Sequence, residues 1–273
     1  MSADRPIVFA TDYGPGTEWV GVCHAVMRRI APRAVIIDLT HSLPRFDVHG
    51  AGLVLRDALP YTPVSVGALV VDPGVGTDRR AVGVRSGRGD LFFGPDNGLL
   101  PLALERVGGV IEARVLSAAG LALGNASTTF HGRDLFCPTA AKVTLGLTFE
   151  SVGPACEASP LVRSAPALLE IGSGSLACEV TNIDGFGNVR LSATPEALSA
   201  ANLAAEQSFW VRTSGGEMAA HRARTFAELG AGRLGLLVDS FGWLALCINR
   251  DSAAARLSIK RGARVELRKH SQP

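Results

Sequence analysis

The sequence lacks the features of a disulfide-rich or membrane protein. Its five cysteines, Cys23, Cys137, Cys156, Cys178 and Cys247, are widely spaced and form no CxxC pair. Such a set predicts neither a disulfide framework nor a zinc site and is typical of reduced cytosolic thiols. No apolar run reaches the ~18 residues that a membrane-spanning helix needs. The start of the chain is too polar for a signal peptide. We therefore expect a cytoplasmic protein without a membrane partner.

An excess of charge of one sign is also absent. The chain carries 27 basic and 25 acidic residues, which gives a formal net charge of +2 at pH 7. The basic residues are scattered, so nothing indicates a nucleic-acid partner. With 273 residues, 47% of them hydrophobic, the chain can bury a large core without disulfides or metals. This length predicts about two domains.

The common phosphate-binding loops are missing as well. The glycine-rich segment DPGVGT at 72–77 has neither the third glycine of GxGxxG nor the GK[ST] ending of a P-loop. This absence argues against NAD or a nucleoside triphosphate as the ligand.

Alternating apolar and amphipathic segments in the first half indicate an α/β domain. Strands are predicted at 6–10, 34–39 and 65–71, a hairpin at 81–85 and 90–93, and helices at 18–30, 48–59, 97–107 and 135–147. Strands that are apolar throughout are buried on both faces, which predicts a Rossmann-like parallel sheet covered by helices.

The pattern changes after residues 152–175, which are rich in Ser, Pro, Ala and Gly and are interpreted as a connection between domains. Short strands separated by glycine-rich turns follow at 176–183, 208–213, 233–239, 244–249 and 263–267. They predict a small antiparallel barrel or sandwich. The expected domains are 1–160 and 172–273.

Polar residues follow the predicted strands at the positions where open α/β sheets bind ligands. Asp12 follows the first strand, Asp72 follows the third, and His131 lies in a loop before a helix. Alone, each aspartate is more typical of a turn or helix cap, and a single loop histidine is more often structural. A site is therefore expected only if these residues share one edge of the sheet.

The motifs resemble those of the S-adenosyl-L-methionine (SAM) hydroxide adenosyltransferase family, which is related to fluorinating and chlorinating enzymes. The matching segments are TDYG at 11–14, DLTHSLPRFDVHGA at 38–51, VVDPGVGTDRR at 70–80, GPDNGLL at 94–100, TFHGRDLFCP at 129–138, IDGFGN at 183–188 and DSFGWLALCINRDSAA at 239–254. They span nearly the whole chain. The resemblance implies an N-terminal α/β domain, a C-terminal β-barrel and a homotrimer with sites at subunit interfaces. It also implies hydrolysis of SAM to adenosine and methionine without a cofactor.

The resemblance also implies residue roles. Asp72, Arg79 and His131 would activate water, and Asp12 would bind the ribose. The remaining substrate-binding candidates are Phe46, Phe130 and Phe186 as aromatic walls, Asp184 for the methionine ammonium, Asn188 for adenine, Ser240 for the methionine carboxylate, and Asn249 with the Arg250 backbone at the adenine edge. Each phenylalanine is equally compatible with a core position.

Departures from the halogenating relatives favour water as the nucleophile. Those relatives carry a halide-binding serine where this chain has Gly132, and they lack a histidine at the position of His131. Two further departures, Arg190 and Phe241, fall in the expected substrate pocket.

The residue types suit displacement at a sulfonium. Attack at the ribose C5′ releases methionine as a neutral thioether, so no general acid is needed. The difficult part is the nucleophile. Arg79 stays charged and would favour hydroxide over water, while His131 would accept a proton or orient the water.

Three other functions stay open from the sequence alone. Asp12, Asp72, His131 and Asp134 are also ligand types of a metal-dependent hydrolase, although no HxH, HExxH or DxD pair is present and no metal is expected. A non-catalytic adenosine or SAM sensor would share the pocket. A halogenase would need halide in place of water.

Overall fold

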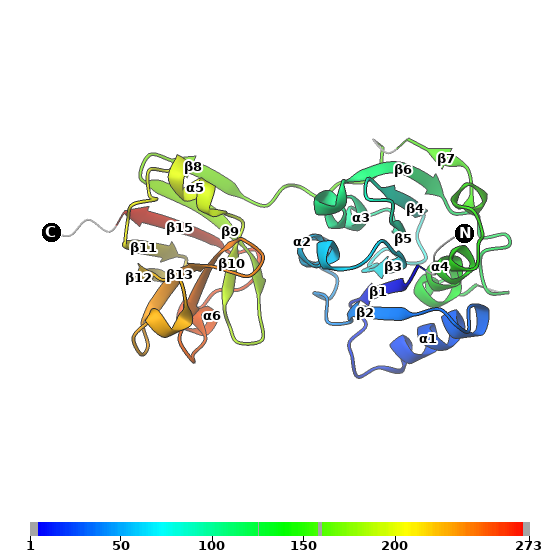
Figure 1. The fold of residues 1–273 in the computed structure, drawn as a ribbon, viewed down its shortest axis with the longest axis horizontal. Coiled ribbons are helices and arrows are strands. Elements are labelled where there is room, and N and C mark those ends of the chain that lie inside the picture. The colour runs from blue at the N-terminus through cyan, green and yellow to red at the C-terminus, as the bar shows by residue number, and fades with distance from the viewer. Residues whose placement is uncertain (1–4, 125, 158–159, 270–273) are drawn as a thin grey trace. The chain divides into compact units, whose positions relative to one another are not determined.

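The computed structural model describes residues 5–124, 126–157 and 160–269. The chain forms two compact units, Met1–Ala165 and Pro166–Pro273 (Figure 1). Each unit has its own buried hydrophobic residues. The division lies inside the segment 152–175, whose composition indicated a connection. None of the described helices is long and apolar enough to cross a membrane.

The first unit is built on a seven-stranded mixed sheet with the order β2-β1-β3-β5-β4-β6-β7. Its strands are β1 (Ile7–Thr11), β2 (Ile36–Thr40), β3 (Val66–Val70), β4 (Ala81–Ser86), β5 (Leu91–Pro95), β6 (Val110–Val115) and β7 (Ala155–Cys156). Strands β2, β1, β3 and β5 pair in parallel, and the β4–β5 hairpin is antiparallel, as the sequence predicts. The edge beyond the hairpin is antiparallel too.

Helices cover both faces of this sheet. The helices are α1 (Glu18–Ile30), α2 (Val48–Ala58), α3 (Leu99–Ala103) and α4 (Cys137–Thr144), with short helical turns η1 (Leu59–Tyr61), η2 (Glu105–Val107), η3 (Gly132–Phe136) and η4 (Phe149–Val152). Ile7 and Phe9 of β1 belong to the core shared with α1 and α4, whereas Val8 and Ala10 belong to the core shared with α2 and α3. Burial on both faces explains why β1 is apolar from Ile7 to Ala10.

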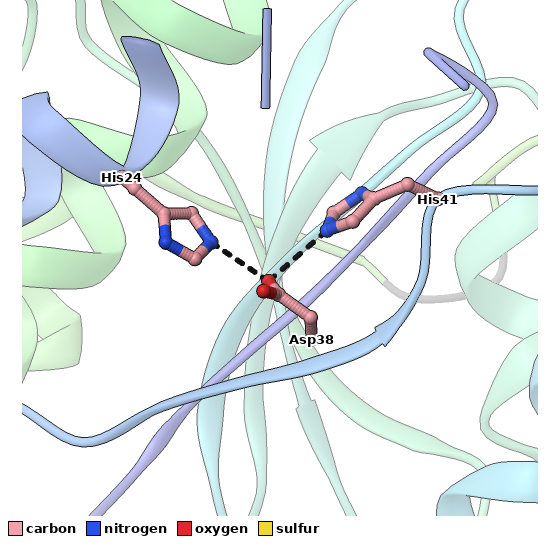
Figure 2. Close-up of side chains that lie close together, drawn as sticks. All are labelled: His24, Asp38 and His41. Carbon is pink, nitrogen blue, oxygen red and sulfur yellow. Dashed lines mark hydrogen bonds and ion pairs between the residues drawn. The ribbon is translucent and has the colours of Figure 1, made fainter. Parts of the chain in front are cut away.

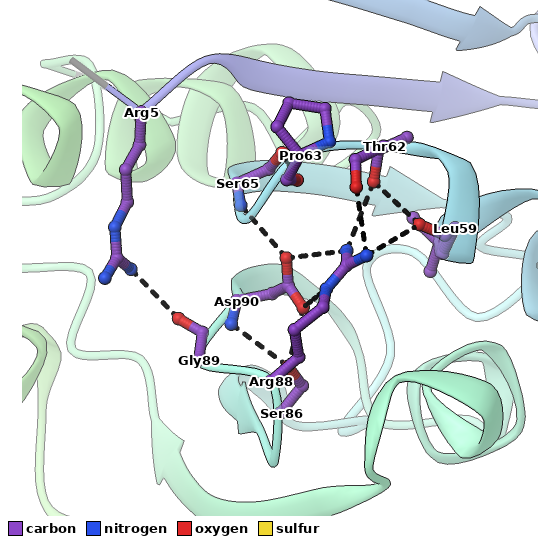
Figure 3. A network of polar contacts seen from close by, with 9 residues as sticks. All are labelled: Arg5, Leu59, Thr62, Pro63, Ser65, Ser86, Arg88, Gly89 and Asp90. Carbon is purple, nitrogen blue, oxygen red and sulfur yellow. Dashed lines mark hydrogen bonds and ion pairs between the residues drawn. The ribbon is translucent and has the colours of Figure 1, made fainter. Parts of the chain in front are cut away.

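A buried carboxylate ties the β4–β5 turn to the chain before β3 (Figure 3). Asp90 accepts hydrogen bonds from the Arg88 guanidinium, the Ser86 hydroxyl and the Ser65 backbone N–H. Burial acts to raise the pKa of Asp90, but these hydrogen bonds outweigh it and the pKa is lowered. Arg88 also donates to the carbonyl oxygens of Leu59 and Thr62, so both the Asp90 carboxylate and the Arg88 guanidinium are paired.

Two predicted helices differ from those observed. The helix expected over 97–107 is the short α3 followed by the 3₁₀ turn η2, because Gly98 has a left-handed backbone (φ 99°) that starts α3 late. The helix expected over 135–147 begins earlier, at the π-helical turn η3, and ends at Thr144. Pro138 lies in the first turn of α4, where a missing N–H is tolerated.

The second unit is a closed β-barrel. Its strands are β8 (Leu169–Gly172), β9 (Ser175–Ile183), β10 (Val189–Leu191), β11 (Ser208–Thr213), β12 (Gly216–Arg222), β13 (Leu234–Val238), β14 (Leu244–Ile248) and β15 (Arg264–Lys269). The order β10-β14-β13-β12-β11-β15-β9 closes through the β9–β10 pairing, and β8 extends β9 outside the ring. Helices α5 (Pro195–Ala200) and α6 (Ala253–Arg256) and the turn η5 (Phe226–Glu228) complete it.

The sequence predicted an antiparallel barrel or sandwich, and one strand pair of the observed barrel differs from this. Strands β12 and β13 pair in parallel, since the chain between them crosses over through η5 instead of turning back. Three strands, β8, β10 and β12, were not predicted. They are short or carry polar and glycine residues, so their pattern resembles that of loops.

Candidate active site

The sheet brings the two strand-end aspartates to one edge. In the parallel pair of β1 and β3, Thr11 is the partner of Val70, so Asp12 and Asp72 both leave at the carboxyl ends. Together with His131 they line a cavity of about 620 Å³ in the first unit. A volume of this size suits a nucleoside-sized ligand. The other lining residues are Tyr13, Thr17, Trp19, Arg45, Phe46, Val70, Val75, Thr129, Phe130 and Gly132.

Arg79 connects the two other groups of the predicted catalytic set. Its Nε donates to Asp72 Oδ1 at 3.0 Å and its Nη2 to Asp72 Oδ2 at 2.5 Å. The same Nη2 lies 2.8 Å from His131 Nδ1. The Arg79 and Asp72 side chains are nearly buried, and the guanidinium also lies over the Phe136 ring. The three residues therefore form an Asp72–Arg79 ion pair whose guanidinium also donates a hydrogen bond to the His131 imidazole.

The contact with Arg79 determines the tautomer of His131. A guanidinium only donates hydrogen bonds, so Nδ1 must be the acceptor and the ring proton must be on Nε2. Burial and the neighbouring Arg79 charge lower the pKa of His131 below its ordinary value, against the opposing effect of Asp72 and Asp134. His131 is thus neutral near pH 7 and carries a donor at Nε2.

Asp12 is held by the loop after β2. Its Oδ2 accepts the backbone N–H of Phe46 at 3.1 Å. Burial raises the pKa of Asp12, partly offset by this hydrogen bond and by the Arg45 charge. Phe46 has a left-handed backbone (φ 60°) and a side chain that is 75% exposed beside the cavity. A strained, exposed aromatic residue at a cavity rim is typical of a ligand contact.

An aromatic cluster forms one wall of the same cavity. Tyr13 and Phe130 meet edge to face with ring centroids 5.5 Å apart, and Trp19 contacts both rings. Phe130 therefore lines the cavity and also packs against the core of the first unit. The Tyr13 hydroxyl fills the space in front of Gly132, where a Cβ would lie 1.9 Å from it. Burial raises the pKa of Tyr13 well above its ordinary value, so the hydroxyl stays protonated.

The remaining predicted binding residues lie in the barrel. Asp184, Phe186, Asn188 and Ser240 line a second cavity of about 590 Å³, and the Phe186 side chain is 83% exposed. The Asp184 carboxylate accepts the backbone N–H groups of Phe186 and Asn188 and the Asn188 amide, which orders the turn between β9 and β10.

Asn249 and Arg250 are not among the residues that line this second cavity. They follow β14 in a turn where Arg250 has a left-handed backbone (φ 61°). That turn leads into α6, whose Ala254 N–H donates to the carbonyl oxygen of Gly187. The pair therefore lies close to the turn that holds Asn188.

Arg190 and Phe241, the two barrel residues that depart from the family pattern, contact each other. The Arg190 guanidinium lies 4.3 Å from the centre of the Phe241 ring, and its Nε donates to Asp239 Oδ2. All three side chains line the second cavity. The pair therefore forms one stacked wall of that cavity.

The metal-hydrolase alternative gains no support from this geometry. Asp72 is paired with Arg79, and Asp134 is bound by Arg133 and by the Ser127 backbone N–H. The guanidinium beside Asp72 and the one beside Asp134 already neutralise these carboxylates and would repel a cation. Within residues 5–124, 126–157 and 160–269, the side chains of this edge do not form a metal-sized group of ligands.

Family models match both units of the chain. The SAM hydroxide adenosyltransferase N-terminal domain matches residues 7–153, and the C-terminal domain of the same family matches residues 178–266. The chain belongs to the SAM hydroxide adenosyltransferase family. The family resemblance drawn from the motifs is thereby confirmed.

Relatives in this family are similar over almost the full length. A protein of Salinispora arenicola named (R)-S-adenosyl-L-methionine hydrolase is 40% identical over 271 residues, covering 98% of this chain and 99% of the relative. A protein of Thermus thermophilus with the same name is 38% identical and covers 96% and 99%. A fluorinase of an Actinoplanes species is 27% identical and covers 96% and 97%. The crystal structure of an uncharacterized conserved protein from Thermotoga maritima is 35% identical, with a TM-score of 0.89 over 96% of this chain and 100% of that one.

Sequence reasoning did not single out Tyr13, Trp19 or Arg45, which line the cavity of this hydroxide adenosyltransferase family member. For Tyr13 and Arg45, the sequence did contain an indication of a site position. Tyr13 follows Asp12 directly, and Arg45 precedes Phe46, so neighbours of predicted site residues were candidates by position. Trp19 lies in α1, where an aromatic residue is more typical of a core position.

Proposed function

We propose that the protein hydrolyses SAM to adenosine and methionine by attack of water at the ribose C5′. The observation that carries this proposal is the Asp72–Arg79–His131 arrangement, in which Asp72 and His131 line a nucleoside-sized cavity and Arg79 contacts both of them. Relatives that are 38–40% identical over nearly the whole chain and are named SAM hydrolases support it.

The reaction is an in-line displacement. The water oxygen forms a bond to C5′ while the C5′–S bond breaks, and the bonding electrons return to sulfur, which leaves methionine as a neutral thioether. The oxygen then loses a proton to give the 5′-hydroxyl of adenosine. Alignment of oxygen, carbon and sulfur can supply up to ~7–11 kcal/mol in favourable cases, so positioning is the main contribution we expect from the protein.

Asp72, Arg79 and His131 each have a different role toward the attacking water. His131 donates a hydrogen bond from its Nε2–H group to the water oxygen, which orients a lone pair of the water toward C5′. Arg79 favours negative charge on that oxygen as a proton is lost. Asp72 accepts the proton on a lone pair that Arg79 does not use and releases it to solvent. The orienting role of His131, one of two alternatives from the sequence, is favoured because Arg79 already occupies Nδ1.

Substrate binding would use both units. Asp12 accepts hydrogen bonds from the ribose diol, and Phe46 and Phe130 provide apolar walls in the first unit. In the barrel, Asp184 binds the methionine ammonium, Ser240 binds the methionine carboxylate, and Phe186 forms a further wall. Asn188, Asn249 and the backbone of Arg250 contact adenine.

The quaternary arrangement we propose is a homotrimer with each site at a subunit interface. The first-unit and barrel residues would then come from adjacent subunits. Exposed Phe46 and Phe186 support this arrangement, because each would become buried on substrate and partner.

We also propose the (R) epimer at sulfur as the preferred substrate. The names of the relatives support this choice, and destruction of the unwanted epimer wastes no useful methyl donor. Rates on the separated epimers test it. Faster turnover of the (S) form would contradict it.

Turnover experiments separate the competing functions. Purified protein incubated with SAM should release adenosine and methionine in large molar excess over protein, whereas a sensor would release none. Turnover should persist in excess chelator, since no step uses a metal. Added chloride should yield no 5′-chloro-5′-deoxyadenosine. Loss of activity with chelator or formation of the halogenated product would contradict the proposal.

A further inference from the structure

A second polar cluster lies outside the proposed active site, between α1 and the end of β2. Asp38 Oδ1 accepts from His24 Nε2 at 2.8 Å and lies 3.0 Å from His41 Nε2. Figure 2 shows the two imidazole rings turned toward this carboxylate from either side. One possible ligand atom from each of the three side chains lies within 4.8 Å of the others.

We propose that His24, Asp38 and His41 form a binding site for a divalent first-row metal ion, with Zn²⁺ as the preferred occupant. Two imidazoles and one carboxylate are a ligand set that suits zinc, and water would fill a fourth position. In a tetrahedral zinc site with bonds of 2.0–2.1 Å, neighbouring ligand atoms lie about 3.3 Å apart. The contacts of 2.8 and 3.0 Å would have to widen by a few tenths of an ångström, and the two imidazoles, whose ligand atoms lie within 4.8 Å of each other, would have to turn to a similar spacing around the ion.

The surroundings of His41 support a ligand role. Its other ring nitrogen, Nδ1, lies 2.9 Å from the Thr11 hydroxyl, and its ring packs edge to face on Phe9. Histidines that bind metals usually donate their second N–H to a fixed oxygen, which leaves the other nitrogen's lone pair for the ion. The Thr11 hydroxyl can accept that proton when metal is bound and can donate to Nδ1 when it is not.

The cluster is also accessible. The His41 side chain is 7% exposed, while His24 and Asp38 are 33% and 40% exposed. One ligand is thus fixed in the core, and the two others face solvent, which gives the ion a path of entry. Among the described residues, no hydrogen bond or ion pair reaches Asp38 Oδ2, so this oxygen is available to the metal or its water.

The ion would stabilise the structure and take no part in hydrolysis. It would join α1 to β2 and, through Thr11, to the end of β1. The proposal does not depend on the proposed enzymatic function, because its test measures metal binding directly.

The test uses the full chain, without a polyhistidine tag and stripped of metal by a chelator. Co²⁺ is titrated while the visible spectrum is recorded, and Zn²⁺ is titrated by calorimetry. We expect one equivalent of Co²⁺ with the intense visible bands of a tetrahedral site, displaced by Zn²⁺. Loss of an outer hydrogen-bond partner weakens metal binding by about 10–100-fold, so Thr11→Val should do the same, and loss of a ligand in His24→Gln should weaken it further.

A matched control is His221→Gln, which removes a histidine that contacts Ser208 in the barrel and should leave binding unchanged. Circular dichroism and the thermal unfolding of each variant report that it has folded. Three results would overturn the proposal. Wild-type protein could take up no metal, which would leave a hydrogen-bonded cluster only. His24→Gln could bind as tightly as wild type. A spectrum dominated by thiolate-to-cobalt charge transfer would place the ion at a cysteine.

Discussion

At the scale of single residues, Arg79 organises the proposed site because its guanidinium contacts Asp72 and His131 at once. The sequence indicated these three residues by motif position, and the structure brings their side chains into contact. Their spacing along the chain, with His131 far from the other two, gives no information about that contact. The tautomer of His131 could not be predicted, since it depends on which nitrogen faces Arg79.

Substitution of the proposed water-handling residues should affect the chemical step. We expect Asp72→Asn and His131→Ala to lower kcat by about 10²–10⁴-fold with little change in KM, because both groups act on the nucleophile. Asp12→Ala should mainly raise KM, because it removes a ribose contact. Steady-state kinetics on the three variants measure this difference. Near-wild-type kcat in both Asp72→Asn and His131→Ala would show that the roles are wrongly assigned.

The pH profile should report His131. Its pKa is lowered by burial and by Arg79, so the ring stays neutral at pH values above that lowered pKa. As the pH falls through it, Nδ1 gains a proton and can no longer accept from Arg79, and activity should fall. The acid limb of kcat/KM should therefore lie below the ordinary histidine pKa of about 6.5. His131→Gln, measured on its residual activity, should lack this limb. A limb that persists unchanged in the variant would assign it to another group.

At the scale of elements, the buried strands made part of the site predictable. Strands β1 and β3 are almost wholly apolar and parallel, so their carboxyl ends place Asp12 and Asp72 on one edge. The helix that follows His131 was predicted three residues late, because the π-helical turn η3 contains Gly132, a residue that disfavours regular helix. Polar strands such as β12 were missed because barrel strands with one solvated face carry little apolar signal.

The contact between η3 and the end of β1 gives a packing prediction. A Cβ at Gly132 would lie 1.9 Å from the Tyr13 hydroxyl and 3.1 Å from the ring carbon that carries it. Gly132→Ala should therefore lower the free energy of unfolding by about 1–3 kcal/mol, as overpacking does. Tyr13→Phe removes the colliding oxygen, so the double variant should recover part of this loss. Denaturant unfolding of both single variants and the double variant measures the coupling. Strictly additive effects would contradict the close approach.

At the scale of the whole molecule, the fold class and the family are well determined by the sequence, because motifs occur in both units and the strand patterns of the two halves differ. The oligomeric assembly is not determined by the sequence. The residues proposed to bind substrate are divided between the two units, and the sequence does not indicate which subunit supplies each half. Contacts between subunits leave no periodic signal in one chain.

Mixed assemblies test the proposed trimer. Asp72→Asn inactivates the first-unit half of a site, and Phe186→Ser alters an exposed barrel residue without disturbing the core. The two variants are mixed, dissociated and reassembled. If each site combines two subunits, about half of the sites receive an intact first unit and about half of those also receive an intact barrel, so roughly a quarter of wild-type activity should return. Light scattering should give three times the chain mass. Mixtures no more active than the sum of their parts, or a monomeric mass, would contradict this assembly.

In the proposed reaction, a water molecule held by Arg79, Asp72 and His131 attacks the carbon next to the sulfonium. Turnover of SAM in ¹⁸O-labelled water, followed by mass spectrometry of the products, tests it most directly. We expect one ¹⁸O atom in the adenosine, at its 5′-hydroxyl, and none in the methionine. Adenosine without the label, or no adenosine formed at all, would contradict it.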